Sequence, residues 1–144
     1  MESIKEKHPM FVINITSKVF KDTMRKKQEA LGIPDGYRMI LMMLHHKDGA
    51  AQQDIAKMSH LSKPTVSLTL SNMENSGLIK RVINEKDKRI VNVYLTKKGN
   101  EMIDKIVSLI KETEDEFFKD YTDNEKELLK TLLERILVNA GFSN

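Results

Sequence analysis

The sequence contains no cysteine and no tryptophan, and only three of its residues are proline and six are glycine. Without cysteine the chain forms neither disulfides nor thiolate zinc sites, and thiol-based redox sensing is excluded. Sandwiches of many short strands need frequent turn residues, so the scarcity of glycine and proline argues against that fold class. With 144 residues, 40% of them apolar, the chain is long enough to bury a core. We expect one domain, residues 1–144, that is mainly α.

Long hydrophobic runs are also missing. The longest uninterrupted apolar run is residues 39–44, which is far shorter than a membrane-spanning helix. The first ten residues, MESIKEKHPM, carry charges that no long apolar stretch follows, unlike a secretory signal peptide. A reducing compartment suits a chain without cysteine. We therefore expect a cytoplasmic protein.

Recognisable catalytic and metal-binding patterns are missing as well. We find no nucleophile with its base, no glycine-rich phosphate loop and no paired-carboxylate site in the sequence. His45 and His46 are adjacent, but no partner stands at ligand spacing, and His8 and His60 belong to unrelated segments. The sequence therefore predicts no enzyme, no cofactor and no metal site.

Charge is unevenly distributed, although the net charge of +3 is small. Residues 51–90 hold seven basic and four acidic side chains, whereas residues 111–135 hold five basic and nine acidic ones. A basic middle and an acidic end favour a polyanion that docks on the middle. Because the net charge of solvated helix faces often differs in sign, this pattern alone does not identify the partner.

Apolar residues recur every three or four positions in six segments, a spacing that predicts helices. Gly32 and Pro34 end the first helix, and Asp35 is a good N-cap for the second, which Gly49 ends. Thr96 caps the fifth. The expected helices cover about residues 9–31, 36–48, 51–58, 63–76, 97–119 and 125–140. Their buried faces are expected at Phe11, Val12, Ile15 and Val19; Tyr37, Ile40, Leu41 and Leu44; Ile55 and Ala56; Val66, Thr69, Leu70 and Met73; Met102, Ile103, Ile106, Val107, Ile110, Phe117 and Phe118; and Leu128, Leu129, Leu132, Leu133, Ile136, Leu137 and Ala140.

The third and fourth helices are joined by a connection of only three residues, 59–61. Ser62 is a strong N-cap, and Pro64 in the first turn costs no hydrogen bond there. So tight a turn holds two helices nearly perpendicular, and the second can enter a major groove about 12 Å wide. The DNA contacts expected on the outer face of this helix are Ser62, Lys63, Pro64, Thr65, Ser67, Leu68, Ser71 and Asn72.

After Gly77 the pattern changes to alternation with β-branched residues, which predicts a β-hairpin with strands over 78–83 and 90–95. Its highly charged tip can lie along the neighbouring minor groove, where narrow A·T-rich DNA attracts arginine. The DNA contacts expected on this wing are Lys86, Asp87, Lys88 and Arg89.

These elements predict a winged helix-turn-helix lobe over residues 35–96, with the helix-turn-helix over about 51–76 and the wing over about 78–96. The flanking segments, 1–31 and 97–144, are long amphipathic helices. Their apolar stripes exceed what so small a lobe can cover, so we expect them to form a homodimer. Burial of the final seam within one chain is the alternative.

Three motifs follow one another: Ser62-Lys63-Pro64-Thr65-Val66-Ser67, the helix exit Met73-Glu74-x-x-Gly77-Leu78-Ile79, and Asp87-x-Arg89 at the wing tip. In this order and spacing they make residues 51–95 similar to the core of the multiple antibiotic resistance regulator (MarR) family. The similarity extends to Thr96-Lys97-Lys98-Gly99 and, counting the flanking helices, to nearly the whole chain.

The resemblance implies a homodimer with interlocked first and last helices, a recognition helix in the major groove and Arg89 in the minor groove. It implies that Asp87 pairs with a nearby basic side chain and holds the wing in shape. Two residues depart from the family pattern: Leu68 stands where many members carry arginine or another polar residue, and His60 replaces a small residue. Ligand-responsive members bind small aromatic or phenolic molecules between the lobe and the dimerisation helices. The residues expected at such an effector pocket are Val12, Ile15, Met42, Met43 and His46.

We therefore expect a dimeric, sequence-specific transcriptional regulator that represses at pseudo-palindromic operators, with half-sites about 10 base pairs apart. One alternative is a protein-interaction module whose fourth helix docks a protein partner. Another is a metal-sensing winged-helix protein, which the lack of cysteine and of clustered histidines disfavours. The methionines of the second helix fit core packing as well as a ligand cavity.

Overall fold

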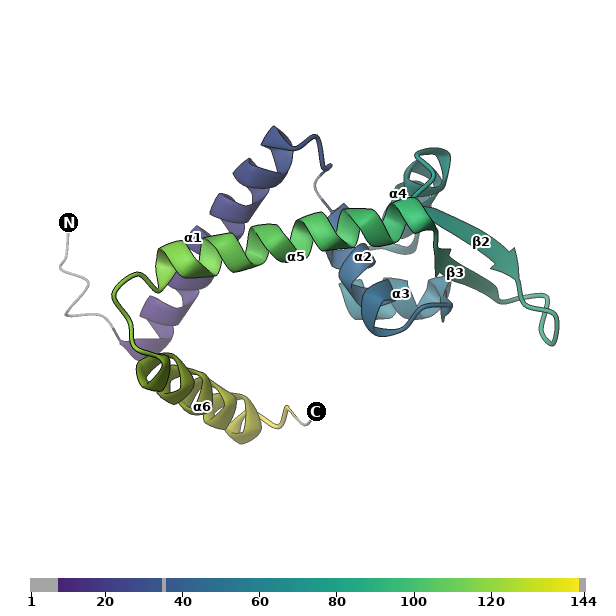
Figure 1. Cartoon of the computed structure of the whole chain (residues 1–144). Coiled ribbons are helices and arrows are strands. Elements are labelled where there is room, and N and C mark those ends of the chain that lie inside the picture. Colours follow the sequence, from purple (N-terminus) through teal and green to yellow (C-terminus); the bar gives the residue numbers. More distant parts are fainter. Residues whose placement is uncertain (1–7, 35, 143–144) are drawn as a thin grey trace. The chain divides into compact units, whose positions relative to one another are not determined.

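The computed structural model describes residues 8–34 and 36–142 (Figure 1). They form two compact units, one reaching to Ile110 and the other beginning at Lys111. The fold is mainly helical with one small antiparallel sheet. In chain order the elements are α1 (Pro9–Ala30), α2 (Tyr37–His46), β1 (Ala50–Ala51), α3 (Gln52–Ser59), α4 (Lys63–Asn75), β2 (Ile79–Ile83), β3 (Val91–Leu95), α5 (Lys97–Phe117) and α6 (Asp123–Asn139). The predicted N-cap Asp35 lies outside the described residues.

The core of the first unit lies where α2, α3, α4 and the sheet meet the first half of α5. Because α2 and α4 repeat apolar residues every three to four positions, each presents one continuous apolar face to this core. The buried positions predicted for α2 and α3 are confirmed, as are three of the four predicted for α4; Thr69 is only half-buried. The core residues of these helices are Tyr37, Ile40, Leu41, Leu44, Ile55, Ala56, Val66, Leu70 and Met73.

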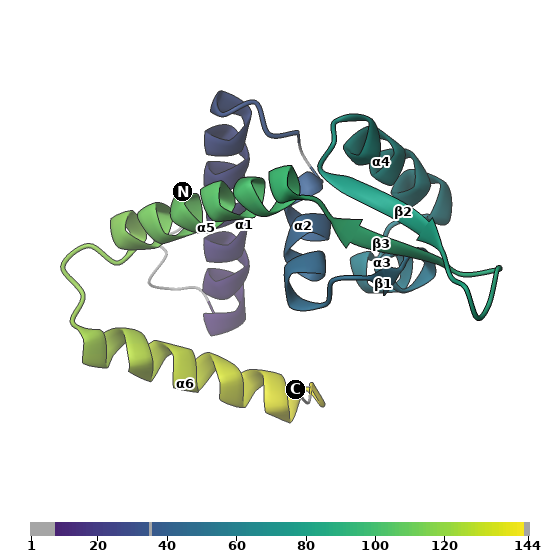
Figure 2. The same cartoon turned by 45° about the vertical axis from the view of Figure 1, so that its right-hand side comes forward.

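The sheet has three strands in the order β1-β3-β2, so it is larger than the predicted hairpin. The hairpin register pairs Arg81 with Val93, and the additional strand β1 pairs Ala50 with the same residue. Sequence reasoning placed Ala51 at the start of a helix, because a strand of two residues is too short to show alternation. Consequently β3 is the central strand, with β2 on one side and β1 on the other (Figure 2).

The long helix α5 is joined closely to the end of α4. The Thr96 hydroxyl caps α5 by accepting a hydrogen bond from the Gly99 N–H, 3.1 Å away, and donates to the Gly77 carbonyl, 2.6 Å away. Lys98 Nζ donates to the Ser76 carbonyl at 2.7 Å. A Cβ on Gly99 would collide with the carbonyl oxygen of Leu78. This junction needs a glycine, because the backbone of the 76–78 turn lies directly against α5.

The buried face predicted for α5 is partly wrong. Ile103 and Ile106 are buried, whereas Val107 is 45% exposed and Leu109 takes a place on the buried side. Positions 103, 106 and 109 step by three along the helix, and Val107 falls outside that stripe. Both Val107 and Leu109 are apolar in the sequence, and which of them is buried depends on where the core contacts the helix.

The second unit carries α6, which begins with a reciprocal cap. The Thr122 hydroxyl accepts from the Glu125 N–H at 3.2 Å, and the Glu125 carboxylate accepts from the Thr122 N–H at 2.7 Å. The hydrogen bonds that the Thr122 N–H and hydroxyl donate to this carboxylate hold the pKa of Glu125 below its ordinary value. The apolar seam predicted for α6 is regular but lies exposed in the single chain, from 36% at Leu133 to 59% at Leu128.

Candidate nucleic-acid interface

Helix α4 starts at the N-cap that the sequence predicts. The Ser62 hydroxyl accepts from the Thr65 N–H at 3.2 Å, and Pro64 lies in the first turn. The preceding connection consists of residues 60–62 rather than 59–61, because Ser59 is the last residue of α3. His60 adopts the left-handed conformation with φ 55°, so this position tolerates a non-glycine residue in the turn between the two helices.

The outward side of α4 carries most of the predicted DNA contacts. Val66, Leu70 and Met73 are fully buried, so the opposite side of the helix faces solvent. Leu68 is 64% exposed on this outward side. Of the predicted contacts, six are exposed and two, Ser67 and Ser71, are half-buried. The exposed six are Ser62, Lys63, Pro64, Thr65, Leu68 and Asn72.

Several hydroxyl groups of α4 already have partners within the protein. The Ser62 and Thr65 hydroxyl oxygens lie 2.7 Å apart. The Ser71 hydroxyl donates to the Ser67 carbonyl at 2.9 Å and accepts from Arg81 Nη2 at 3.1 Å. Ser71 therefore has both a donor and an acceptor partner inside the fold, which leaves it less available to a base edge than its neighbours.

Arg81 and Glu74 fasten the end of α4 to β2, a contact that sequence reasoning missed. Arg81 Nε donates to Glu74 Oε2 at 2.8 Å, and the Arg81 backbone N–H donates to Oε1 at 3.1 Å. These hydrogen bonds hold the pKa of Glu74 below its ordinary value. The two residues belong to different elements with different periods, so no single repeat pattern could have paired them.

At the wing tip, Arg89 and Asp87 form a two-pronged ion pair. Arg89 Nε and Nη2 donate to the two oxygens of Asp87 at 3.0 and 2.9 Å, and the Arg89 N–H donates to Oδ1 at 3.0 Å. The pair lowers the pKa of Asp87 and raises that of Arg89. The basic partner that the resemblance implied for Asp87 is thus Arg89 itself. The Arg89 side chain remains 90% exposed.

Two asparagines anchor the wing to the rest of the lobe. Asn84 Nδ2 donates to Asn92 Oδ1 at 2.9 Å, and Asn92 Nδ2 donates to the Gly49 carbonyl at 2.8 Å. The Asn84 side-chain oxygen accepts from the N–H groups of Lys86 and Asp87 and thereby shapes the turn. The loop that carries the basic tip is therefore tied to Gly49, just before β1, through side chains as well as through the strands.

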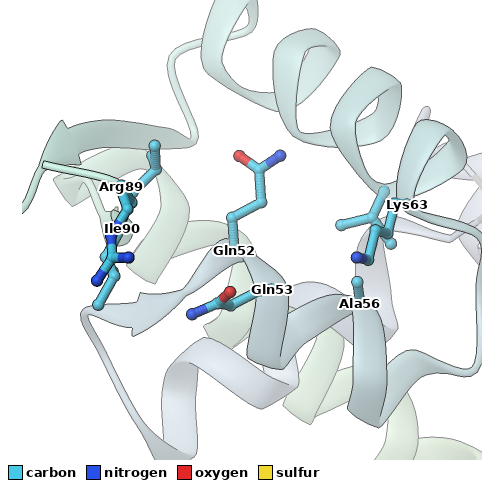
Figure 3. A pocket seen from close by; sticks show the side chains of 8 residues that line it. Gln52, Gln53, Ala56, Lys63, Arg89 and Ile90 are labelled. Atoms are coloured by element: carbon cyan, nitrogen blue, oxygen red, sulfur yellow. The ribbon is translucent and has the colours of Figure 1, made fainter.

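A hollow of about 200 Å³ lies between α3, the start of α4 and the stretch of the wing from Arg89 to Val91. Figure 3 shows Gln52 between Arg89 on one side and Lys63 on the other, with Gln53 nearby. Two carboxamides and two cations offer donors suited to phosphate oxygens. Sequence reasoning missed Gln52 and Gln53, because nothing in a helical repeat shows that the wing folds over the first turn of α3.

Comparisons with known proteins agree with this geometry. A family model described as "MarR family" matches residues 38–91, from α2 to the start of β3. The chain belongs to the MarR family. A curated relative is the "HTH-type transcriptional regulator BilQ" of Clostridium symbiosum, 29% identical over 105 residues that cover 73% of each chain. MarR-family proteins are regulators of transcription rather than enzymes, and this chain is a MarR-family transcriptional regulator.

Solved MarR-family structures match nearly the whole chain. A structure titled "Crystal structure of S. aureus MepR-DNA complex" is 29% identical, with a TM-score of 0.76, and the match covers 93% of this chain and 99% of that one. A structure titled "Crystal Structure of MarR" is 24% identical with a TM-score of 0.82 and covers 97% and 95% of the two chains. The match to MarR shows the winged-helix fold, and the match to the MepR complex also supports a relationship in sequence.

The residues predicted for a MarR-type effector pocket lie on α1 and α2. Met42 and Met43 are half-buried against the core, Val12 and Ile15 are half-buried on α1, and His46 is exposed at the end of α2. None of them lines the hollow beside α4, nor a groove of about 430 Å³ in the second unit, whose apolar lining is Phe118, Leu129, Leu133 and Leu137. The five residues therefore stay a prediction.

Metal-ligating side chains do not cluster within residues 8–34 and 36–142, where no group of three or more His, Asp or Glu side chains is placed to hold an ion. In the same part of the chain, no helix combines the length and the apolar character needed to cross a bilayer.

Proposed function

We propose that this MarR-family protein binds duplex DNA as a homodimer and represses transcription at pseudo-palindromic operators. The observation that supports it best is the pairing of an outward-facing α4 with an exposed wing. The outer face of α4 starts with Lys63, and the tip of the wing carries Arg89 with a 90% exposed side chain. A helix of this kind fits the major groove while the wing follows the adjacent minor groove.

In this proposal the contacts divide into two classes. Leu68 and Asn72 face base edges, because they lie along the exposed side of α4. The remaining proposed contacts on α4 and the wing hold the DNA backbone and set the position of the helix. That set comprises Ser62, Lys63, Pro64, Thr65, Ser67, Ser71, Lys86, Lys88 and Arg89, with Arg89 reaching into the minor groove. Asp87 belongs to the same surface and orients Arg89 through their ion pair.

The dimer is proposed from apolar surfaces that a single chain leaves uncovered. Within α6, seam residues such as Leu132 and Leu137 are 44% and 49% exposed. Within α1, Phe11 and Val19 are 48% and 49% exposed, although both belong to its apolar stripe. Apolar surface of this extent is costly in water, and a two-fold partner would bury it. The same two-fold axis would set two copies of α4 about one DNA turn apart.

Regulation by a small aromatic or phenolic effector is part of the proposal, with Val12, Ile15, Met42, Met43 and His46 as its contacts. The five residues occupy α1, which precedes the DNA-binding lobe in the chain, and α2, the first helix of that lobe. An effector acts by binding more tightly to a dimer whose two recognition helices are misspaced. Its effect on operator affinity is then limited to its preference between the two states.

The test is a fluorescence anisotropy titration of the full-length protein against duplex DNA selected from a random library, repeated at several salt concentrations. We expect specific binding whose affinity falls steeply with salt, because phosphate neutralisation releases counterions. Arg89→Ala should weaken binding by about an order of magnitude at fixed salt and leave the dimer intact. Arg135→Ala, which removes an exposed arginine of α6, is the matched control and should bind like the wild type.

Two results would contradict the proposal. If Arg89→Ala binds with an unchanged dissociation constant, the wing has no part in binding. If no duplex is retained even at low salt, while a protein partner is retained through α4, the lobe is a protein-interaction module instead.

A further inference from the structure

The exposed side of α4 has an unusual composition for a helix that reads a major groove. Within α4 the sequence KPTVSLTLSNMEN contains one cation, Lys63, at the first position, and no arginine. Arginine and lysine are the residues that read guanine, by donating to its O6 and N7. Because Lys63 lies at the end of the helix, the middle of the reading face has no guanine reader.

Internal hydrogen bonds further reduce the groups that can read bases. The Thr69 hydroxyl donates to the Thr65 carbonyl at 2.9 Å, and the Thr65 hydroxyl is already joined to that of Ser62. The Ser71 hydroxyl is held between Ser67 and Arg81. The Arg81 guanidinium is in turn bonded to Ser71 and Glu74 within the protein.

Two side chains remain whose chemistry discriminates bases, Leu68 and Asn72. Both are exposed, and within the described residues no group hydrogen-bonds the Asn72 carboxamide. They stand four residues apart on one face, about 6 Å along the helix axis. That distance equals about two steps of 3.4 Å along a DNA strand. A helix lying along the groove would thus present them to base pairs about two apart.

We infer that α4 is specific for A·T pairs, with Leu68 packing on a thymine methyl group and Asn72 pairing with N6 and N7 of an adenine. Apolar side chains recognise the methyl that distinguishes thymine, and asparagine is the two-pronged partner of adenine. The inference rests on the proposed DNA binding and adds the base class that each side chain reads. It also gives the exposed Leu68 a role, as a side chain that recognises a methyl group in the groove.

The experiment changes single groups on the DNA bases as well as single side chains of the protein. Duplexes selected by the full-length protein are resynthesised with one thymine replaced by deoxyuridine, which lacks the methyl, or one adenine replaced by 7-deazaadenine, which lacks N7. Each is titrated against the wild type, Leu68→Ala and Asn72→Ala in a double-mutant cycle. The controls are Val138→Ala, an apolar residue 68% exposed on α6, and Asn14→Ala, an exposed asparagine on α1.

We expect one deoxyuridine position at which wild-type affinity falls about fourfold, the effect of one buried methyl group, and at which Leu68→Ala is insensitive. We expect one adenine, about two base pairs away, at which 7-deazaadenine weakens the wild type about tenfold and leaves Asn72→Ala unaffected. Both control variants should respond to the analogues like the wild type. Because each comparison is between two duplexes bound by the same variant, a uniform loss of affinity from poor folding cancels.

The inference is overturned if the two variants stay as sensitive to the analogues as the wild type. A selected half-site with essential guanines at those positions, sensitive to 7-deazaguanine, overturns it too. Either result leaves the proposed DNA binding in place, because a sequence-specific site has still been selected. Failure to select any duplex would contradict the proposed function itself, so the two failures are distinguishable.

Discussion

Replacing Gly99 by alanine tests the junction between α4 and α5, because two effects of opposite sign compete at this position. Gly99 lies in the first turn of α5, and alanine forms a helix better than glycine by about 1 kcal/mol. The added Cβ would collide with the carbonyl oxygen of Leu78. That atom belongs to the backbone, and its neighbourhood is fixed by hydrogen bonds of Thr96 and Lys98 to Gly77 and Ser76.

The strain outweighs the gain in helix propensity. Inserting a methyl group into packed surroundings costs about 1–3 kcal/mol, and an immobile backbone neighbour puts Gly99 near the upper end. After subtracting about 1 kcal/mol for propensity, we expect Gly99→Ala to lower the unfolding free energy by about 2 kcal/mol. For a chain of this size the melting temperature should fall by about 5 °C.

Thermal unfolding followed by circular dichroism at one fixed protein concentration measures the change, since the stability of a dimer depends on concentration. Ser108→Ala is the control, because Ser108 is exposed on the same helix and its replacement should be neutral or slightly stabilising. A melting temperature of Gly99→Ala equal to or above that of the wild type would refute the close packing of α5 on the 76–78 turn.

Three further predictions concern other parts of the chain. The pKa of Glu74 is lowered by hydrogen bonds in the folded state. The stabilisation that its carboxylate supplies is therefore complete above the pKa of the unfolded state and is lost as the pH falls through the pKa of the folded state. The stability advantage of the wild type over Glu74→Gln, measured by urea unfolding, should shrink below about pH 4. Asn92→Ala removes the partner of Asn84 and of a backbone carbonyl and should cost about 1–3 kcal/mol in the same assay; an unchanged midpoint would show that water replaces both bonds. Leu132→Glu places a charge in the α6 seam and should give a monomer by light scattering, whereas Val138→Glu, on the opposite side of α6, should remain a dimer.

The sequence predicts the helices of the lobe well, because their burial is periodic within one element. The faces of α2 and α4 follow directly from the spacing of Ile40 and Leu44 or of Val66 and Leu70, and Ser62 with Pro64 marks the start of α4. The fold class and the family also follow from such local signals, because the winged helix-turn-helix order of elements is short in sequence.

Features that depend on contact between elements could not be predicted. Strand β1 exists because β3 offers it an edge, and two residues carry no pattern of their own. The Arg81–Glu74 pair and the approach of Gln52 to Arg89 depend on the packing of strands against helices. The wrong placement of Val107 has the same origin, because a broad apolar stripe does not reveal which of its edges meets the core.

The fork between Asp87 and Arg89 has a consequence for the thermodynamics of binding. An arginine whose guanidinium is already oriented loses little rotational freedom when it meets DNA. The entropic cost of ordering this long side chain is therefore incurred when the wing folds and not when the protein associates with DNA. The neutralising carboxylate also weakens the long-range attraction of this arginine for phosphate. Lys86 and Lys88 are then the wing residues that draw the protein toward DNA from a distance, and Arg89 acts only after contact.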